Sequence, residues 1–252
     1  MRKIILFSLF GLLVFVSSCS SLPALQSTWS SSSFLKKSKE DVEANIFFPE
    51  DELTLKIFND KDYLDLIVAT NSPITLNKIY NLGLSIWLDP QGSNKQVFGV
   101  NFPLPVDKPY SRSAFKKYIS HFKINELQEE LSDRFQKYEY EDIRLNENIS
   151  VSTLNQDEAC QVNLKSNNQV LFSCHIRISL KKLMEADFVI GDKEKVGVSI
   201  FSTALATEAY RSSLSSREVI NQRLNELKAG DDPNRQELIE QWTNFSLAKE
   251  NK

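Results

Sequence analysis

Stretches in which apolar residues occupy every second position constrain the fold of this chain more than any other feature. They cover residues 53–57, 64–68, 82–88, 160–164 and 170–178. A period of two places alternate side chains on opposite faces of a β-strand. Turn residues follow some of these stretches, as in the Asn-Asp-Lys-Asp and Asp-Pro-Gln-Gly sequences. The pattern predicts a mainly β protein, an antiparallel β-sandwich.

Three segments have helical rather than strand spacing. Ser72 and Pro73 are suited to cap and begin a short helix. Residues 112–138 carry an apolar stripe and predict an inserted helical segment, either one broken helix or two short ones. This stripe packs against the body or, alternatively, against a partner. Residues 215–240 predict a helical C-terminal segment, after which the chain fits either a last strand or more helix.

The N-terminus has the features of a secretory leader. Arg2 and Lys3 precede a run over 4–16 that is apolar at every position but one. A bilayer span needs roughly 20 residues, so this run is too short and fits a signal peptide instead. The run ends in Val-Ser-Ser-Cys, which resembles a bacterial lipobox. We predict a signal peptide over 1–18 and acyl chains on Cys19. The alternatives are an ordinary signal with a chance cysteine and an uncleaved anchor.

A serine-rich segment follows and predicts a flexible tether, so that residues 19–44 form the lipidated linker and 45–252 the folded domain. Ser20 stands where an Asp would favour retention at the inner membrane. We therefore predict an outer-membrane lipoprotein that faces the periplasm. Cleavage of the leader changes the net charge from 30 − 33 = −3 to 28 − 33 = −5. No basic excess indicates a nucleic-acid partner.

Cys160 and Cys174 are candidates for a disulfide. A three-residue loop over 166–168 would place them opposite each other on two paired strands. Lipidation of Cys19 leaves these two as an even pair in a compartment that permits disulfides. Closing a loop of this length would stabilise the fold by roughly 3 kcal/mol. The alternative is two free thiols buried in the core.

Four aromatic residues are candidates for a platform that stacks against sugar rings. They are Trp87, Phe98, Phe102 and Tyr110. Residues two apart in a strand share a face, so such a platform suits a sheet. Trp87 lies on the face opposite the apolar residues of its strand, which predicts that it is solvent-facing or packed under the helical insert. The alternative for all four is ordinary packing.

Catalytic and metal-binding motifs are missing from the sequence. We find no Ser-His-acid order, HExxH, P-loop or GxGxxG. Asn59, Asp60 and Asp62 carry oxygen ligands suited to calcium, but they lack the full loop motif and its downstream Glu. Turn chemistry alone explains them. We therefore expect no metal and no cofactor, and no catalytic residue is assigned.

Residues 46–105 resemble a group of bacterial, mainly Bacteroidetes, lipoproteins of unassigned function. The resemblance rests on the strand pair over 53–70, on Leu-Gly-Leu-Ser-Ile-Trp-Leu-Asp-Pro-Gln-Gly over 82–92, and on Phe-Gly-Val-Asn-Phe-Pro over 98–103. The order is also similar to the β-sandwich of DOMON domains and family 9 carbohydrate-binding modules, which bind sugars or haem. The resemblance implies a jelly-roll-like sandwich. Met184 and His175 do not form a recognisable haem motif, and the helical additions depart from such modules.

Together these features predict a lipid-anchored envelope protein with a non-catalytic binding or envelope-interaction role. The expected partners are the membrane, through the anchor, and an envelope protein or a carbohydrate-like ligand. One alternative is a carboxylate-dependent hydrolase of envelope polymers, and another is a purely structural assembly lipoprotein. Two carboxylates less than about 10 Å apart in a cleft would favour the hydrolase. An exposed aromatic or apolar patch without such a pair would favour binding.

Overall fold

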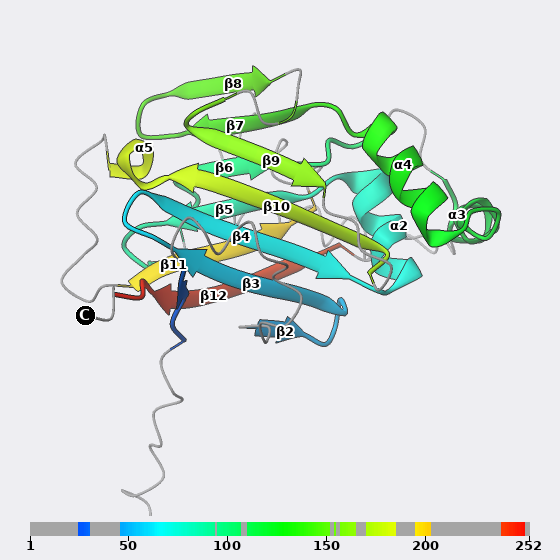
Figure 1. The fold of residues 1–252 in the computed structure, drawn as a ribbon, viewed down its shortest axis with the longest axis horizontal. Coiled ribbons are helices and arrows are strands. Elements are labelled where there is room, and N and C mark those ends of the chain that lie inside the picture. The colour runs from blue at the N-terminus through cyan, green and yellow to red at the C-terminus, as the bar shows by residue number, and fades with distance from the viewer. Residues whose placement is uncertain are drawn as a thin grey trace, which may run out of the picture.

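The computed structural model describes residues 25–30, 46–93, 95–106, 110–151, 154, 157–164, 170–184, 195–202 and 238–249. Two β-sheets enclose one hydrophobic core (Figure 1). The first sheet contains β1 (Thr28–Trp29), β2 (Ile46–Phe48), β3 (Leu53–Asn59), β4 (Tyr63–Thr70), β9 (Cys160–Leu164) and β10 (Phe172–Ser179). The second sheet contains β5 (Ser85–Asp89), β6 (Phe98–Asn101), β7 (Tyr138–Asp142), β8 (Glu147–Val151), β11 (Lys195–Phe201) and β12 (Glu240–Ser246).

The strand order is β1-β3-β4-β10-β9 in the first sheet, where β2 also pairs with β3, and β12-β11-β5-β6-β7-β8 in the second. Among these strands, β1 and β3 pair in parallel and every other pairing is antiparallel. The predicted fold class, a mainly β antiparallel sandwich, is confirmed.

Alternation along the strands places one apolar row of each sheet in the core. In β3, for example, Leu53, Leu55 and Ile57 are completely buried. The Tyr138 hydroxyl of the second sheet donates a hydrogen bond to the Cys160 carbonyl of the first sheet. Each large side chain buried in this way contributes roughly 1.5–3 kcal/mol, so the shared core is the main source of stability.

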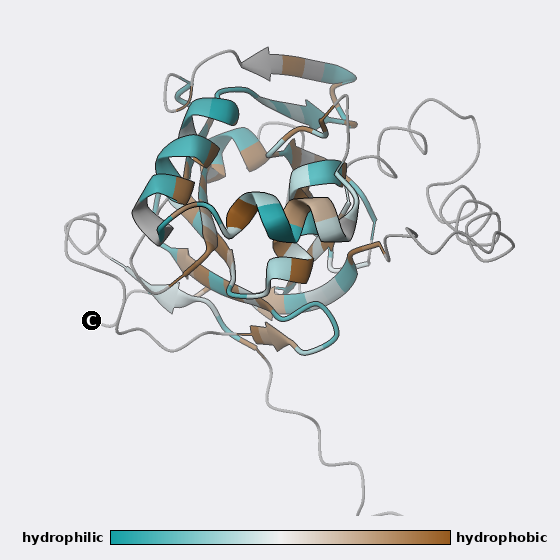
Figure 2. Ribbon diagram, turned by 90° about the vertical axis from the view of Figure 1, so that its right-hand side faces the viewer, coloured by the Kyte–Doolittle hydropathy of each residue, from teal (hydrophilic) through white to brown (hydrophobic). Residues whose placement is uncertain are grey.

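Helices gather at one end of the sandwich, as Figures 1 and 2 show from two directions. They are α2 (Pro73–Leu82), α3 (Arg112–Ile119) and α4 (Ile124–Arg134), while the short α5 (Leu180–Met184) follows β10. Ser72 caps α2 by accepting a hydrogen bond from the Thr75 amide, and Pro73 occupies the first turn, as predicted. The inserted segment forms two short helices, which was one of the two forms that its sequence allowed.

An aromatic cluster joins the inserted helices to α2. Tyr80 of α2 lies 5.0 Å from Phe115 and 6.1 Å from Tyr118 between ring centroids. Tyr110 stacks on Tyr118 at 5.4 Å, and its backbone exchanges two hydrogen bonds with the Asn81 side chain. The apolar stripe of residues 112–138 therefore packs against the body of the protein.

Residues 25–30 lie within the segment predicted to be a flexible tether, and for them that prediction is wrong. The Ser30 amide donates to the Asn59 carbonyl at 2.9 Å, beside the β1–β3 pairing. The Ser27 amide donates to the Ser246 carbonyl, and the Ser246 amide to the Leu25 carbonyl, both at 2.9 Å. The segment thus pairs with edges of both sheets. Unpaired edge strands have free backbone groups that a neighbouring segment can satisfy.

The C-terminal ambiguity at residues 242–247 is resolved in favour of a strand. Residues 240–246 form β12, which pairs with β11 along its whole length. The predicted helical segment over 215–240 lies outside the described residues as far as 237, and its last residue, Glu240, belongs to β12.

The predicted register of the cysteine hairpin is wrong. Cys160 opposes Ile178 and Cys174 opposes Leu164, so the two cysteines are four residues out of register. Both are buried free thiols, which was the alternative to a disulfide. The register places residues 164 and 174 opposite each other, and the intervening connection is longer than the three-residue turn that the prediction assumed.

The signal peptide over 1–18, Cys19 and most of the linker over 19–44 lie outside the described residues, so these assignments remain predictions. In the part of the chain that the structure describes, we find no helix that is long and apolar enough to cross a membrane.

Candidate functional site

Two of the four predicted platform residues lie in the core. Phe98 and Phe102 are completely buried, and Phe98 stacks on Tyr140 at 5.9 Å. The prediction of a surface platform is wrong for them because Phe98, Val100 and Phe102 occupy alternate positions and share the inward face. Tyr110 is also excluded, since it belongs to the aromatic cluster that joins the inserted helices to α2.

Trp87 lies on the outer face of the second sheet. Its cross-strand neighbours are Ser199 on β11 and Gly99 on β6. It packs in a small cluster with Phe201 and the half-buried Trp242. Only 1% of its side chain is exposed. Trp87 is therefore neither solvent-facing nor packed under the helical insert, the two positions that the sequence predicted.

Residues of five neighbouring strands stand in register across this face, and we call them the outer row. They are Trp242 on β12, Ser199 on β11, Trp87 on β5, Gly99 on β6 and Glu141 on β7. Adjacent strands lie about 4.8 Å apart, so the outer row extends over roughly 19 Å. Gly99 leaves space for the indole ring of Trp87, because a Cβ there would lie 2.7 Å from three ring atoms.

A chain of hydrogen bonds runs beside the outer row. The Ser85 hydroxyl donates to Asn101 Oδ1 at 2.5 Å, and Asn101 Nδ2 donates to Glu141 Oε1 at 3.1 Å. Each of the three residues is on a different strand, and all are at least nine-tenths buried. These two hydrogen bonds orient the Glu141 carboxyl and satisfy one of its two oxygens.

Three polar atoms of the outer row have no hydrogen-bond partner among the described residues. They are Trp87 Nε1, Ser199 Oγ and Glu141 Oε2. The exposed fractions of these side chains are 1%, 1% and 5%, respectively. A buried polar group without a partner costs roughly 1–3 kcal/mol. Three such atoms in one row mark a place where a polar ligand would stabilise the protein.

Burial raises the pKa of the Glu141 carboxyl above its usual value of 4.5. The hydrogen bond from Asn101 acts in the opposite direction, and the nearby charge of Glu139 raises the pKa further. The carboxyl therefore keeps its proton to a higher pH than a solvated glutamate. In its protonated form it donates as well as accepts hydrogen bonds.

Aromatic rings beside mixed donors and acceptors are suited to sugars. A pyranose has apolar C–H groups that pack on an aromatic face and hydroxyl groups that both donate and accept. Trp87 Nε1 only donates, whereas Ser199 Oγ does both. Binding sites commonly combine an apolar wall with a few placed polar groups in this way. The outer row therefore has the composition of a carbohydrate site.

The other face of the molecule carries a buried charge cluster that the sequence did not reveal. His175 Nε2 and Asp65 Oδ1 lie 2.6 Å apart, and Arg177 lies 3.8 Å from Asp65 and 3.4 Å from Asp60. Asp60 also accepts hydrogen bonds from two backbone amides of its turn at 2.7 Å. Asp60 therefore holds the turn after β3, as the turn interpretation of residues 59–62 predicted.

Clusters of metal-ligating side chains are missing from the described part of the chain. No three His, Cys, Asp or Glu side chains there gather so as to hold a metal ion. His121, the other histidine, is exposed after α3, and its Nδ1 lies 2.5 Å from the Lys117 carbonyl oxygen.

Comparisons with known proteins assign this chain to no family. No family model and no curated protein matches the chain. A solved structure that is similar is a family 9 carbohydrate binding module from Caldicellulosiruptor kristjanssonii in complex with glucose. The identity is 9%, the match covers 79% of this chain and 78% of that chain, and the TM-score is 0.30. No residue or ligand is carried over from this similarity, and the fold assignment rests on the two sheets themselves.

Proposed function

We propose that this chain is a non-catalytic carbohydrate-binding protein, held in the cell envelope by acyl chains on Cys19, at the outer membrane and facing the periplasm. The outer row carries the binding part of the proposal, because three unpaired polar atoms there share one face with two indole rings. The anchoring part is supported by the N-terminal sequence.

The three unpaired atoms select the ligand class. Trp87 Nε1 requires an acceptor and the ionised Glu141 carboxylate requires a donor, whereas Ser199 Oγ pairs with either. Neighbouring sugar hydroxyls supply both kinds. An apolar ligand would leave all three atoms unpaired, so it would gain much less from this face.

Entry of the ligand is expected from the β12 end of the outer row. Trp242 at this end is half-buried, and Glu240 on the same strand is exposed, whereas Trp87 and Ser199 are almost inaccessible. Contact with the whole row therefore requires a change of conformation around Trp87. Slow association would follow from such a change.

The test uses the chain from Ser20 onward on an array of immobilised neutral and acidic oligosaccharides. The best soluble glycan is then titrated by calorimetry. We expect Ser199→Ala and Glu141→Ala each to weaken binding by about tenfold, because each leaves a bound hydroxyl without its partner. Ser173→Ala is the matched control, since Ser173 is a half-buried serine on the first sheet. Absence of any glycan binding, or equal binding by all variants, would refute the proposal.

A second candidate function, a carboxylate-dependent hydrolase, is favoured by one observation. Glu139 and Glu141 are two residues apart on β7 and share the outer face, so their Cα atoms lie about 7 Å apart. Pairs of carboxyl groups about 5–9.5 Å apart cleave glycosidic bonds, with the group of raised pKa as the acid. New reducing ends from the bound glycan, abolished in Glu141→Gln, would support the hydrolase in place of the binding protein.

The proposed anchor would hold the domain close to the membrane. Leu25 is already paired with Ser246, so only residues 20–24 separate Cys19 from the folded part. Fully extended, a link of this kind reaches about 20 Å. The domain would therefore stay near the bilayer surface instead of ranging on a long tether.

A further inference from the structure

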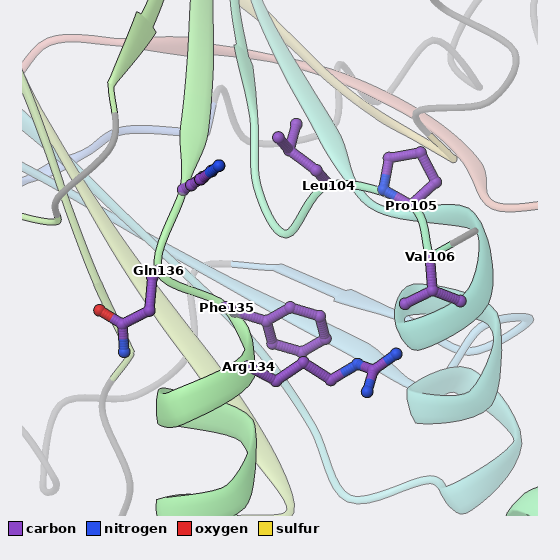
Figure 3. Close-up of a pocket in the computed structure, with 7 residues that line it drawn as sticks. Leu104, Pro105, Val106, Arg134, Phe135 and Gln136 are labelled. Carbon is purple, nitrogen blue, oxygen red and sulfur yellow. The ribbon is translucent and has the colours of Figure 1, made fainter. Parts of the chain in front are cut away.

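A pocket of about 490 Å³ lies at the helical end of the sandwich, apart from the outer row. Leu104, Pro105 and Val106, which follow β6, form one side. Arg134 and Phe135 at the end of α4 form the other, as Figure 3 shows. A volume of this size accommodates a small organic ligand.

Part of the pocket wall is apolar, and the core holds Phe135 in place. Phe135 is buried and its ring lies edge-on to Phe102 at 6.4 Å. Leu104 and Val106 are half-buried and face the pocket from the opposite side. Gln136 points away, because its side-chain amide donates to the Ser132 carbonyl. The interior surface therefore suits an apolar group.

Two of the described residues that line the pocket are cations, Arg134 and Lys137, and none of them is a carboxylate. The Arg134 guanidinium lies over the Tyr80 ring at 4.8 Å, which fixes its position. Glu130, one turn earlier in α4, would be the natural partner of Arg134, but it accepts the Tyr118 hydroxyl at 2.7 Å. Among the described residues, neither cation has an ion-pair partner.

We propose that this pocket binds an amphiphilic anion, a carboxylate or phosphate group joined to an apolar chain. The anionic group lies between Arg134 and Lys137, where the guanidinium offers a planar pair of donors. The apolar chain of the ligand packs on Leu104, Val106 and Phe135. This site is independent of the outer row, so it stands or fails separately from the carbohydrate proposal.

The position of the pocket favours a free molecule over a lipid of the anchoring membrane. β1 joins the first sheet beside Asn59, at the end of β3. The helices lie at the opposite end of the sandwich (Figure 1), and Arg134 and Phe135 at the end of α4 line the pocket. An anchor at Cys19 thus leaves the pocket on the side remote from its own attachment.

Calorimetric titration of the chain from Ser20 onward tests the proposal with decanoate as probe, kept below its micelle concentration, and decanol as the uncharged match. We expect decanoate to bind at least about tenfold more tightly than decanol, the effect of one charge-assisted contact. Lys137→Gln should remove most of this preference. Val106→Asp, which adds a negative charge to the wall, should weaken decanoate binding further.

Lys61→Gln is the matched control, because Lys61 is an 82% exposed lysine on the turn at the other end of the molecule. Thermal unfolding of each variant shows that the fold is retained. Equal binding of decanoate and decanol, no binding of either, or equal affinity of Lys137→Gln and Lys61→Gln would overturn the proposal. Binding of the wild type and of Lys137→Gln to phosphatidylglycerol vesicles is measured as well. Lys137-dependent binding to vesicles without binding to decanoate would also overturn it, in favour of a membrane surface.

Discussion

Gly99 is the residue of the outer face that tolerates a side chain least. A Cβ there would lie 2.7 Å from three atoms of the Trp87 ring. We expect Gly99→Ala to lower the free energy of unfolding by about 1–3 kcal/mol, the range for overpacked sites. Urea unfolding followed by tryptophan fluorescence measures this change. Gly197→Ala is the control, with its nearest contact at 3.1 Å to the Asn244 side chain, and it should cost less. Equal losses would contradict the argument.

Glu141 makes the stability of the fold depend on pH. Its pKa is raised in the folded state above the usual value of 4.5, mainly by burial. Between the unfolded and the folded pKa values the folded chain binds more protons, so stability falls as the pH rises through this window. Glu141→Gln removes the titrating group. We expect the wild type to lose stability relative to this variant as the pH rises from below 4.5 toward neutrality. If the urea midpoints of the wild type and of Glu141→Gln change in parallel with pH, the pKa of Glu141 is not raised.

At the scale of elements, the β9–β10 hairpin predicts how its cysteines behave. Cys160 and Cys174 are completely buried, and burial raises the pKa of the Cys174 thiol to about 12. A thiol that is neither exposed nor ionised reacts slowly. In the chain from Ser20 onward we expect no alkylation of either thiol before unfolding, and the same melting temperature with and without a reductant. An intact mass two hydrogens lower, restored by reductant, would show a disulfide and a different register.

The same hairpin shows where local pattern stops being informative. Alternation located both strands, because a side chain's face depends only on its own strand. The register depends on how the connection closes and on which rows fit the core and the neighbouring β4. Assuming the shortest loop therefore misplaced Cys160 relative to Cys174 by four residues.

At the scale of the whole molecule, the prediction concerns attachment to the envelope. We expect full-length protein, expressed in a bacterium, to fractionate with membranes and to incorporate an alkyne analogue of palmitate. The Cys19→Ala variant should lose both the fractionation with membranes and the incorporation of the analogue, because one or more acyl chains supply the membrane affinity. Cys160→Ala serves as a matched cysteine control and should retain both properties. Recovery of unmodified wild-type protein in the soluble fraction, with residue 19 bare, would contradict the anchor.

The candidate site was only partly accessible from sequence. The sequence points to Trp87, because an indole out of phase with its apolar neighbours faces away from the core. It does not point to Ser199, Glu141 or Trp242, since each lies on a strand distant in sequence. A signal was present in Glu139 and Glu141, which alternate with the buried Tyr138 and Tyr140. It indicated the face of β7 but not its neighbours.

The amino-acid sequence by itself determined the strands β3, β4, β5, β9 and β10, the first turn of α2 and the class of fold, because alternation and capping act over a few residues. Only the tertiary structure decided that Phe98 and Phe102 face the core, that residues 25–30 pair with the sheet edges, and that Arg134 and Lys137 line one pocket. These outcomes join segments far apart in the chain. Their positions depend on register and on shared burial, which no local pattern encodes.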